Sequence, residues 1–153
     1  METDDFFMGL ALEEAEKGYR LDEVPVGAVL VAADGLVLSR AHNMPISSND
    51  STAHAEVVAI RKACASLGNY RLSGTVLYVT LEPCAMCVGA MLHARVGRLV
   101  FGARDPRSGA AGSVLDLTNV ARFNHRIEVT GGVLAEKCAE MLRTFFKDRR
   151  SAK

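Results

Sequence analysis

Apolar and polar positions divide the first forty residues into a helix followed by a hairpin. In residues 4–18 apolar side chains recur at helical spacing, acids fill the first turn and a glycine stands at the end, so a helix is predicted. Residues 25–32 form an apolar run rich in β-branched side chains, and residues 36–40 form a second run after Asp34-Gly35. Because Asp-Gly favours tight hairpin turns, the two runs are predicted to pair as antiparallel strands.

Helical and strand patterns then alternate through the rest of the chain. The predicted order is a polar loop at 43–51, a helix at 53–67, a strand at 75–80, a helix at 84–93, a strand at 98–102, mixed loop and turn at 103–125, a short strand at 126–130 and a closing helix at 135–149. Strands that alternate with helices call for parallel crossovers, and the helices then cover both faces of the sheet. We therefore predict a single α/β domain over residues 1–153, a three-layer α/β/α sandwich with a mixed central sheet.

Two of the four cysteines open a predicted helix directly after a predicted strand. Cys84 and Cys87 form a C-x-x-C pair, which places both thiols on one face near the positive end of the helix dipole. This position favours thiolates, the form of cysteine that binds metals. By itself, the pair fits a structural zinc site, a redox pair or a chance spacing.

A second group of polar residues stands at the start of the preceding predicted helix. His54 and Glu56 lie there, and crossovers that end at one sheet edge would bring them close to Cys84 and Cys87. His54 and Glu56 can face one site only if His54 lies in an irregular first turn, which the polar capping residues before it permit. The predicted zinc ligands are His54, Cys84 and Cys87.

This group of residues favours a catalytic zinc site over a structural one. A structural zinc takes four protein ligands, whereas a catalytic zinc keeps one position open for water. Cys64 lies too far along its helix from His54 to be a fourth ligand, and Cys138 stands among apolar neighbours typical of a buried thiol. With the fourth position left to water, Glu56 is the predicted catalytic acid and base.

Length and charge exclude several classes of protein. The 153 residues carry 18 basic and 18 acidic side chains, which argues against a polyanion binder that works through overall charge. No apolar stretch is long enough to span a membrane, and the acidic N-terminus differs from a secretory signal, so a cytoplasmic protein is expected. The balance conceals an acidic segment at residues 1–23 and a basic one at residues 143–153. Such runs are usually solvated helix faces, but a basic end is also a candidate contact for a charged partner.

The motifs around the predicted zinc site resemble a known family. His54-Ala55-Glu56 and Pro83-Cys84-Ala85-Met86-Cys87 match the H-x-E and P-C-x-x-C signature of zinc-dependent nucleobase deaminases. Nearly the whole chain resembles the bacterial-type tRNA-specific adenosine deaminases. The stretches that carry this resemblance are VPVGAV at 24–29, YRL at 70–72, LYVTLEPC at 77–84, VFGARD at 100–105, GAAGS at 109–113 and NHR at 124–126.

This resemblance implies a cytidine deaminase-like fold and a homodimer that carries one Zn²⁺ per subunit and no organic cofactor. It implies hydrolysis of adenosine to inosine at the wobble position, with the tRNA anticodon stem-loop as the partner. It also implies that Asn43 hydrogen-bonds the target base. Residues 44–50 lack the basic side chain that relatives often carry there.

RNA contacts are predicted from the loop at 105–113 and from the end of the C-terminal helix. There Phe145 and Phe146 stand close to Arg149 and Arg150, and aromatic rings beside arginines are typical of single-stranded RNA sites. Helical periodicity indicates that one of the two phenylalanines faces the core. The predicted substrate-binding residues are Asn43, Asp105, Phe145, Phe146, Arg149 and Arg150. Further arginines are expected within or near the active-site side, namely Arg95, Arg98, Arg104 and Arg107.

Two other functions are compatible with the predicted zinc site. A free nucleobase or nucleoside deaminase that acts on guanine, cytosine or cytidine could share every catalytic residue. A non-catalytic zinc-containing RNA-binding subunit would keep the ligands but could discard the carboxylate. The loop at 105–113 and the basic end favour RNA over a free base, and the presence of Glu56 favours an enzyme.

Overall fold

The computed structural model describes residues 2–151, and it contains each predicted helix and strand with ends that shift by at most two residues. The helices are α1 (Glu2–Arg20), α2 (Pro45–Ser48), α3 (Ala55–Leu67), α4 (Ala85–Ala94) and α5 (Ala135–Ser151). The strands are β1 (Gly27–Val31), β2 (Val37–His42), β3 (Val76–Leu81), β4 (Arg98–Ala103) and β5 (Glu128–Thr130). None of the helices in this range is both long enough and apolar enough to span a membrane.

The strands form one mixed sheet in the order β2-β1-β3-β4-β5. β1 is antiparallel to both of its neighbours, β2 and β3, whereas β4 is parallel to β3 and to β5. The predicted hairpin is the β1–β2 pair. The mixed central sheet with helices on its faces confirms the predicted fold class.

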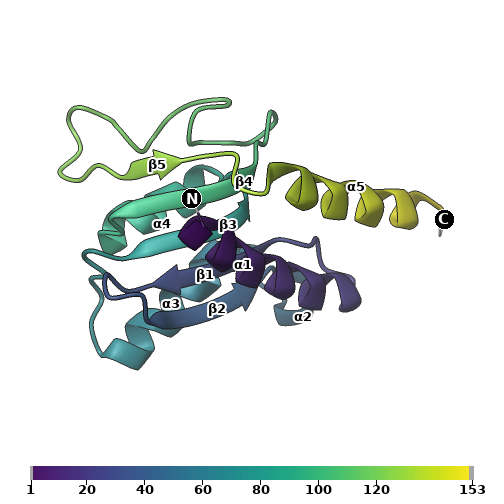
Figure 1. The fold of residues 1–153 in the computed structure, drawn as a ribbon, viewed down its shortest axis with the longest axis horizontal. Coiled ribbons are helices and arrows are strands. Elements are labelled where there is room, and N and C mark those ends of the chain that lie inside the picture. The colour runs from purple at the N-terminus through teal and green to yellow at the C-terminus, as the bar shows by residue number, and fades with distance from the viewer. Residues whose placement is uncertain (1, 152–153) are drawn as a thin grey trace.

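Helices cover both faces of the sheet (Figure 1). α1 lies across one face together with the start of α5, and α3 and α4 lie across the other. Neighbouring residues of β3 show the alternation, because Leu77 and Val79 pack with α3 and α4 whereas Tyr78 packs with Phe7 of α1. The rest of α5 extends beyond the sheet, so the C-terminal end of this helix is exposed.

α1 packs directly on the backbone of β1. A Cβ atom at Gly27 would lie 1.9 Å from the carbonyl oxygen of Ala11, so no residue with a side chain fits there. Near the start of α1, buried Asp4 accepts two hydrogen bonds from Arg98 of β4 (2.7 and 3.0 Å) and one from the Tyr78 hydroxyl (2.9 Å). These contacts hold α1 on the face of the sheet opposite α3 and α4.

The segment after β2 differs from the prediction. The predicted polar loop at 43–51 contains the short helix α2, which begins at Pro45, ends at Ser48 and is capped by Asn49, a residue with a left-handed backbone (φ 52°). Buried Glu23 accepts a hydrogen bond from the backbone N–H of Ser47 (2.7 Å) in this helix. A helix of four residues is too short to show an apolar period, so the sequence pattern could not reveal it.

The strand directions place two helix starts at the same edge of the sheet. β2 and β3 are both antiparallel to β1, so they run in the same direction and end at the same edge. α3 follows β2 after α2, and α4 follows β3 directly. The N-termini of α3 and α4 therefore meet at this edge, as the crossover argument predicts.

Candidate active site

Three metal-binding side chains meet where α3 and α4 begin. The Sγ atoms of Cys84 and Cys87 lie 3.7 Å apart, and Nδ1 of His54 lies 3.6 Å from the first and 3.5 Å from the second. A tetrahedral zinc ion, with Zn–S bonds of about 2.3 Å and Zn–N bonds of about 2.0 Å, holds such atoms about 3.5 to 3.8 Å apart. The donor set and its spacing therefore fit zinc. Among residues 2–151, no other group of His, Cys, Asp and Glu has comparable geometry.

Two of these side chains come from helix N-cap positions. His54 is the N-cap of α3 (φ −70°, ψ 151°), and Cys84 is the N-cap of α4 (φ −78°, ψ 176°). At an extended residue the side chain does not follow the helical direction, so His54 and Glu56 can face the same site. This confirms the irregular first turn predicted for His54. Cys87 lies one turn into α4 and is buried.

The surroundings of the two thiols favour a thiolate at Cys84. Hydrogen bonding with Cys87, and then with His54, lowers the pKa of the Cys84 thiol to about 3. The contact with Cys84, together with burial, raises the pKa of the Cys87 thiol. Cys84 is therefore a thiolate at neutral pH beside the positive end of the α4 dipole, which is the form that binds a metal.

Glu56 is the buried carboxyl group of the site. It stands in the first turn of α3, is 4% exposed and lines the same cavity as His54 and Cys84. Burial raises the pKa of Glu56 to about 7, although hydrogen bonding and His54 act in the opposite direction. A carboxyl group with a pKa near neutrality can both accept and donate a proton, as general acid–base catalysis requires.

A first cavity, of about 310 Å³, opens beside these residues. Asn43 lines this cavity. Its side chain is oriented by α3, because Oδ1 of Asn43 accepts a hydrogen bond from the backbone N–H of Ala55 (2.8 Å). With this oxygen engaged, the NH₂ group of Asn43 is the donor that remains for a ligand. The full lining consists of Val24, Val26, Asn43, Pro45, His54, Glu56, Leu81, Glu82, Cys84, Asp105 and Ser108.

A second cavity, of about 580 Å³, adjoins the first one. The two cavities share the lining residues Val24, Leu81, Asp105 and Ser108. The other residues of the second cavity come from the segment after β4 and from α5, namely Arg104, Arg107, Leu142, Phe146 and Arg150. The structure thus brings three of the predicted RNA contacts, Asp105, Phe146 and Arg150, to one cavity, which adjoins the cavity of the metal-binding side chains.

Phe145 does not fit its predicted role as an RNA contact. It is 3% exposed, and its ring packs edge-on against Tyr19 of α1, so no base can stack on it and the prediction is wrong. The expectation that one of the two phenylalanines faces the core is confirmed, because Phe146 is 45% exposed. Arg149 places its guanidinium over the Phe145 ring, 5.1 Å from the centroid, and its contact with RNA stays a prediction.

Two of the arginines expected near the active-site side lie elsewhere. Arg104 and Arg107 line the second cavity, as expected. Arg98 instead forms an ion pair with Asp4 beneath α1, and Arg95 is the C-cap of α4 and lines a separate cavity of about 440 Å³. Both residues stand between the end of α4 and the start of β4, at the edge of the sheet opposite the end of β3 and the start of α4.

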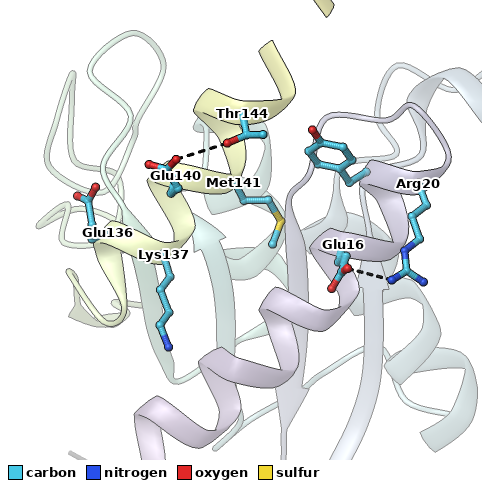
Figure 2. A pocket seen from close by; sticks show the side chains of 8 residues that line it. Glu16, Arg20, Glu136, Lys137, Glu140, Met141 and Thr144 are labelled. Carbon is cyan, nitrogen blue, oxygen red and sulfur yellow. Dashed lines mark hydrogen bonds and ion pairs between the residues drawn. The ribbon is translucent and has the colours of Figure 1, made fainter. Parts of the chain in front are cut away.

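A larger cavity, of about 760 Å³, lies away from this site between α1 and α5 (Figure 2). Polar groups in its walls pair with one another, because Arg20 donates to Glu16 (2.9 Å) and Thr144 donates to Glu140 (3.5 Å). Its lining contains neither histidine nor cysteine. The candidate active site is therefore located by its donor set rather than by the size of its cavity.

Glu82 lines the first cavity but was not predicted from the sequence, and Ser108, which also lines it, belongs to the predicted RNA-binding loop at 105–113 but was not named as a site residue. Glu82 directly follows β3 and stands two residues before Cys84. A carboxylate at the end of an apolar strand is a signal that could have indicated it, because ligand sites of α/β sheets lie at such ends. Ser108 stands in an irregular loop and carries no comparable signal.

Known proteins are similar in sequence to this chain over most of its length. Residues 1–103 match the family model described as the cytidine and deoxycytidylate deaminase zinc-binding region. The chain is 48% identical to the tRNA-specific adenosine deaminase of Bacillus subtilis, over 100% of this chain and 94% of that protein. It is 49% identical to the tRNA-specific adenosine deaminase of Haemophilus influenzae, over 99% of this chain and 88% of that protein.

Solved structures also share the fold, and two of them are compared with this chain. One comes from studies of A-to-I editing by tRNA:A34 deaminases at the wobble position of transfer RNA, and it matches with a TM-score of 0.86 at 47% identity, over 90% of this chain and 99% of that chain. A guanine deaminase from Nitrosomonas europaea matches with a TM-score of 0.78 at 27% identity, over 92% of this chain and 83% of that chain. The similarity to proteins named for tRNA is therefore the stronger of the two.

Proposed function

The chain belongs to the tRNA-specific adenosine deaminases, within the cytidine and deoxycytidylate deaminase zinc-binding family, and from this we infer that it hydrolyses adenosine to inosine at the wobble position of a tRNA anticodon. The observation that carries this inference is the meeting of His54, Cys84 and Cys87 beside the buried Glu56 at one cavity. Hydrolytic deamination needs a metal to activate water and a side chain to move protons, and the site offers both.

His54, Cys84 and Cys87 are the proposed ligands of one zinc ion per chain. Their spacing suits tetrahedral zinc, and they are three in number, as in catalytic sites that leave a position for water. When bound, zinc supplies a Lewis acid that lowers the pKa of a water molecule toward neutrality. The first cavity provides the space from which water and substrate reach these side chains.

Glu56 is the proposed acid and base of the reaction. Its carboxylate accepts a proton from the attacking water and donates it to N1 of adenine as the water oxygen bonds to C6. It then carries the proton of the new C6 hydroxyl to the amino group, so the C6–N6 bond breaks, the C6 carbonyl of inosine forms and ammonia leaves. Burial keeps bulk water from competing for these protons.

The first cavity is the proposed place for the target adenine. A base stacked in a duplex hides C6, so the substrate base is extruded or lies in a single-stranded loop, as in an anticodon. The NH₂ group of Asn43 can donate to a ring nitrogen of the base, since its oxygen is held by α3. Asn43 and Glu56 both line the first cavity, so both can contact a base that is held there.

The second cavity is the proposed place for nucleotides next to the target base. Arg104, Arg107 and Arg150 bring positive charge to its wall, and Phe146 offers an exposed ring for stacking. Phosphate contacts beside a stacking platform are typical of single-stranded RNA sites. The basic end of the chain thus contributes a local patch, although its last basic residue, Lys153, lies outside the described residues.

The family resemblance also supports a homodimer, a cytoplasmic location and no organic cofactor. The location follows from the tRNA substrate, and hydrolysis needs water alone as the second reactant. Light scattering on the purified protein tests the dimer. The mass of two chains is expected, and the mass of one chain in an active sample would contradict it.

A comparison of substrates tests the proposed function. Zinc-loaded protein is incubated with an anticodon stem-loop RNA that carries adenosine at the wobble position, and separately with guanine, cytosine and cytidine. Ammonia release is expected from the stem-loop and not from the three small molecules. Ammonia release from a small molecule, with none from the stem-loop, would instead support a free nucleobase or nucleoside deaminase, the alternative that agrees with the similarity to a guanine deaminase.

A further inference from the structure

Glu82 lies between the metal-binding turn and the loop at 105–113, and it is almost fully buried, with 2% exposed. Its Oε1 accepts hydrogen bonds from the backbone N–H of Asp105 (3.1 Å) and from the Ser113 hydroxyl. Its Oε2 accepts from the backbone N–H groups of Ala111 (3.0 Å) and Ser113 (3.0 Å). One carboxylate therefore satisfies donors from both ends of the loop.

A backbone contact beside Glu82 ties the middle of the same loop to the metal-binding turn. The N–H of Ala110 donates to the carbonyl oxygen of Pro83 (2.8 Å), the residue before Cys84. The loop also passes so close to the carboxylate that a Cβ atom at Gly109 would lie 2.4 Å from Cδ of Glu82. The position of this loop relative to Cys84 is thus set through Glu82 and Pro83.

The start of this loop forms walls of both cavities at the proposed RNA site. Asp105 and Ser108 line the first cavity and the second. The Oδ1 atom of Asp105 accepts hydrogen bonds from the backbone N–H groups of Arg107 (3.0 Å) and Ser108 (3.2 Å). The anchor at Asp105 therefore also sets the direction in which Arg107 and Ser108 leave the sheet.

We propose that Glu82 is a positioning residue for RNA binding, which holds the loop at 105–113 against the metal-binding turn so that both cavities accept the anticodon together. This inference rests on the proposed function, since it concerns the same site. It assigns to Glu82 an effect on substrate binding and none on the proton transfers, which belong to Glu56.

The variant Glu82→Gln tests this role because it keeps the shape of the side chain and turns one acceptor oxygen into a donor. If its NH₂ faces Ala111 and Ser113, it opposes two backbone N–H donors. If it faces Asp105, it opposes one N–H, while the Ser113 hydroxyl can rotate to accept. The second orientation costs less, so the variant should release the loop mainly at Asp105.

The expected result is a KM for the anticodon stem-loop that rises about 10-fold, the size expected for one lost hydrogen bond to a charged group. The kcat value and the zinc content should stay close to those of the unmodified protein. Ser113→Ala removes one of the four hydrogen bonds and should raise KM by a smaller factor. This second variant keeps the test decisive if Glu82→Gln does not fold.

Glu14→Gln is the matched control, because Glu14 is a similarly buried carboxylate (4% exposed) that pairs with Lys17 and Arg40 away from both cavities. It should lower thermal stability and leave KM unchanged. The proposal is overturned if Glu82→Gln and Ser113→Ala leave KM unchanged, if Glu14→Gln raises KM equally, or if Glu82→Gln lowers kcat and zinc content alone. If the unmodified protein makes no inosine in the stem-loop, the proposed function fails instead.

Discussion

His54 and Cys84 show how single residues at helix starts build the site. An N-cap position usually holds Ser, Thr, Asp or Asn, whose side chain satisfies a backbone N–H of the first turn. Neither His54 nor Cys84 makes such a capping hydrogen bond. The two side chains point toward each other instead of capping their helices, and Nδ1 of His54 lies 3.6 Å from Sγ of Cys84.

Glu56→Gln should abolish most of the turnover without loss of zinc. The amide has nearly the same volume but cannot accept the proton of water, so we expect the rate of inosine formation to fall by about 100-fold or more. Elemental analysis should find as much zinc as in the unmodified protein. A zinc-loaded variant that retains near-normal activity would remove Glu56 from the mechanism.

Cys84→Ser should lose zinc and activity together, because a serine hydroxyl is a much weaker zinc ligand than a thiolate. Cys64→Ser is the matched control, since Cys64 is a free thiol of α3 outside the group of three metal-binding side chains. The control should keep its zinc. Full zinc occupancy in Cys84→Ser, measured by elemental analysis, would contradict the assignment of this ligand.

The sequence predicted the ligands but not the residues that position the loop around them. His54, Glu56, Cys84 and Cys87 all lie within three residues of a helix start, so motif spacing alone brings each pair together. Glu82 contacts Asp105 and residues up to Ser113, which stand 23 to 31 positions later in an irregular loop. No local period encodes a contact of that kind.

At the scale of elements, α1 depends on the ion pair between Asp4 and Arg98. Asp4→Asn should lower the free energy of unfolding by about 1.5–3 kcal/mol near pH 7, the usual contribution of hydrogen bonds to a charged group. The hydrogen bonds from Arg98 hold the pKa of Asp4 below its ordinary value of 3.8. Urea unfolding of both proteins measures the difference.

The same variant has a defined pH dependence. Because the folded-state pKa of Asp4 is lowered, the stability that its carboxylate contributes is present above about pH 4 and is lost as the pH falls through the folded pKa. The difference in stability between the two proteins should therefore be constant from about pH 5 to 8 and shrink in acid. An equal difference at about pH 3 and pH 7 would show that the charge of Asp4 is not its cause.

α5 carries the proposed phosphate contact on the end that extends beyond the sheet. Arg150→Ala should weaken binding of the stem-loop and reduce the slope of log affinity against log salt by about 1, as expected for one lost phosphate contact. The binding measurement uses the Glu56→Gln background, so that the RNA stays unreacted.

Arg143→Ala provides the control for Arg150. It removes the same charge from the same helix, but Arg143 already pairs with Glu136 (2.5 Å) and Glu140 (2.6 Å). The control should leave the salt slope unchanged. Equal effects of the two substitutions would mean that the charge of α5, rather than the second cavity, determines RNA binding.

At the scale of the whole molecule, local patterns predicted the elements and the layers but not the strand order. The apolar periods predicted the ends of every strand, and of every helix except the short α2, to within two residues. β1 contacts β3 with Val29 opposite Tyr78, and neither strand carries a sequence signal for the antiparallel direction, because both are mainly apolar. The net charge of zero likewise did not predict the local basic patch that the arginines of the second cavity form.

The central claim is that this site converts adenosine to inosine at the wobble position of a tRNA, and sequencing of treated tRNA tests it most directly. Bulk tRNA without inosine is incubated with the zinc-loaded protein or with the Glu56→Gln variant, and the reverse-transcribed products are compared. We predict that adenosine at the wobble position is copied as guanosine after treatment with the unmodified protein only. An unchanged wobble adenosine in RNA treated with fully zinc-loaded, folded protein would contradict this account.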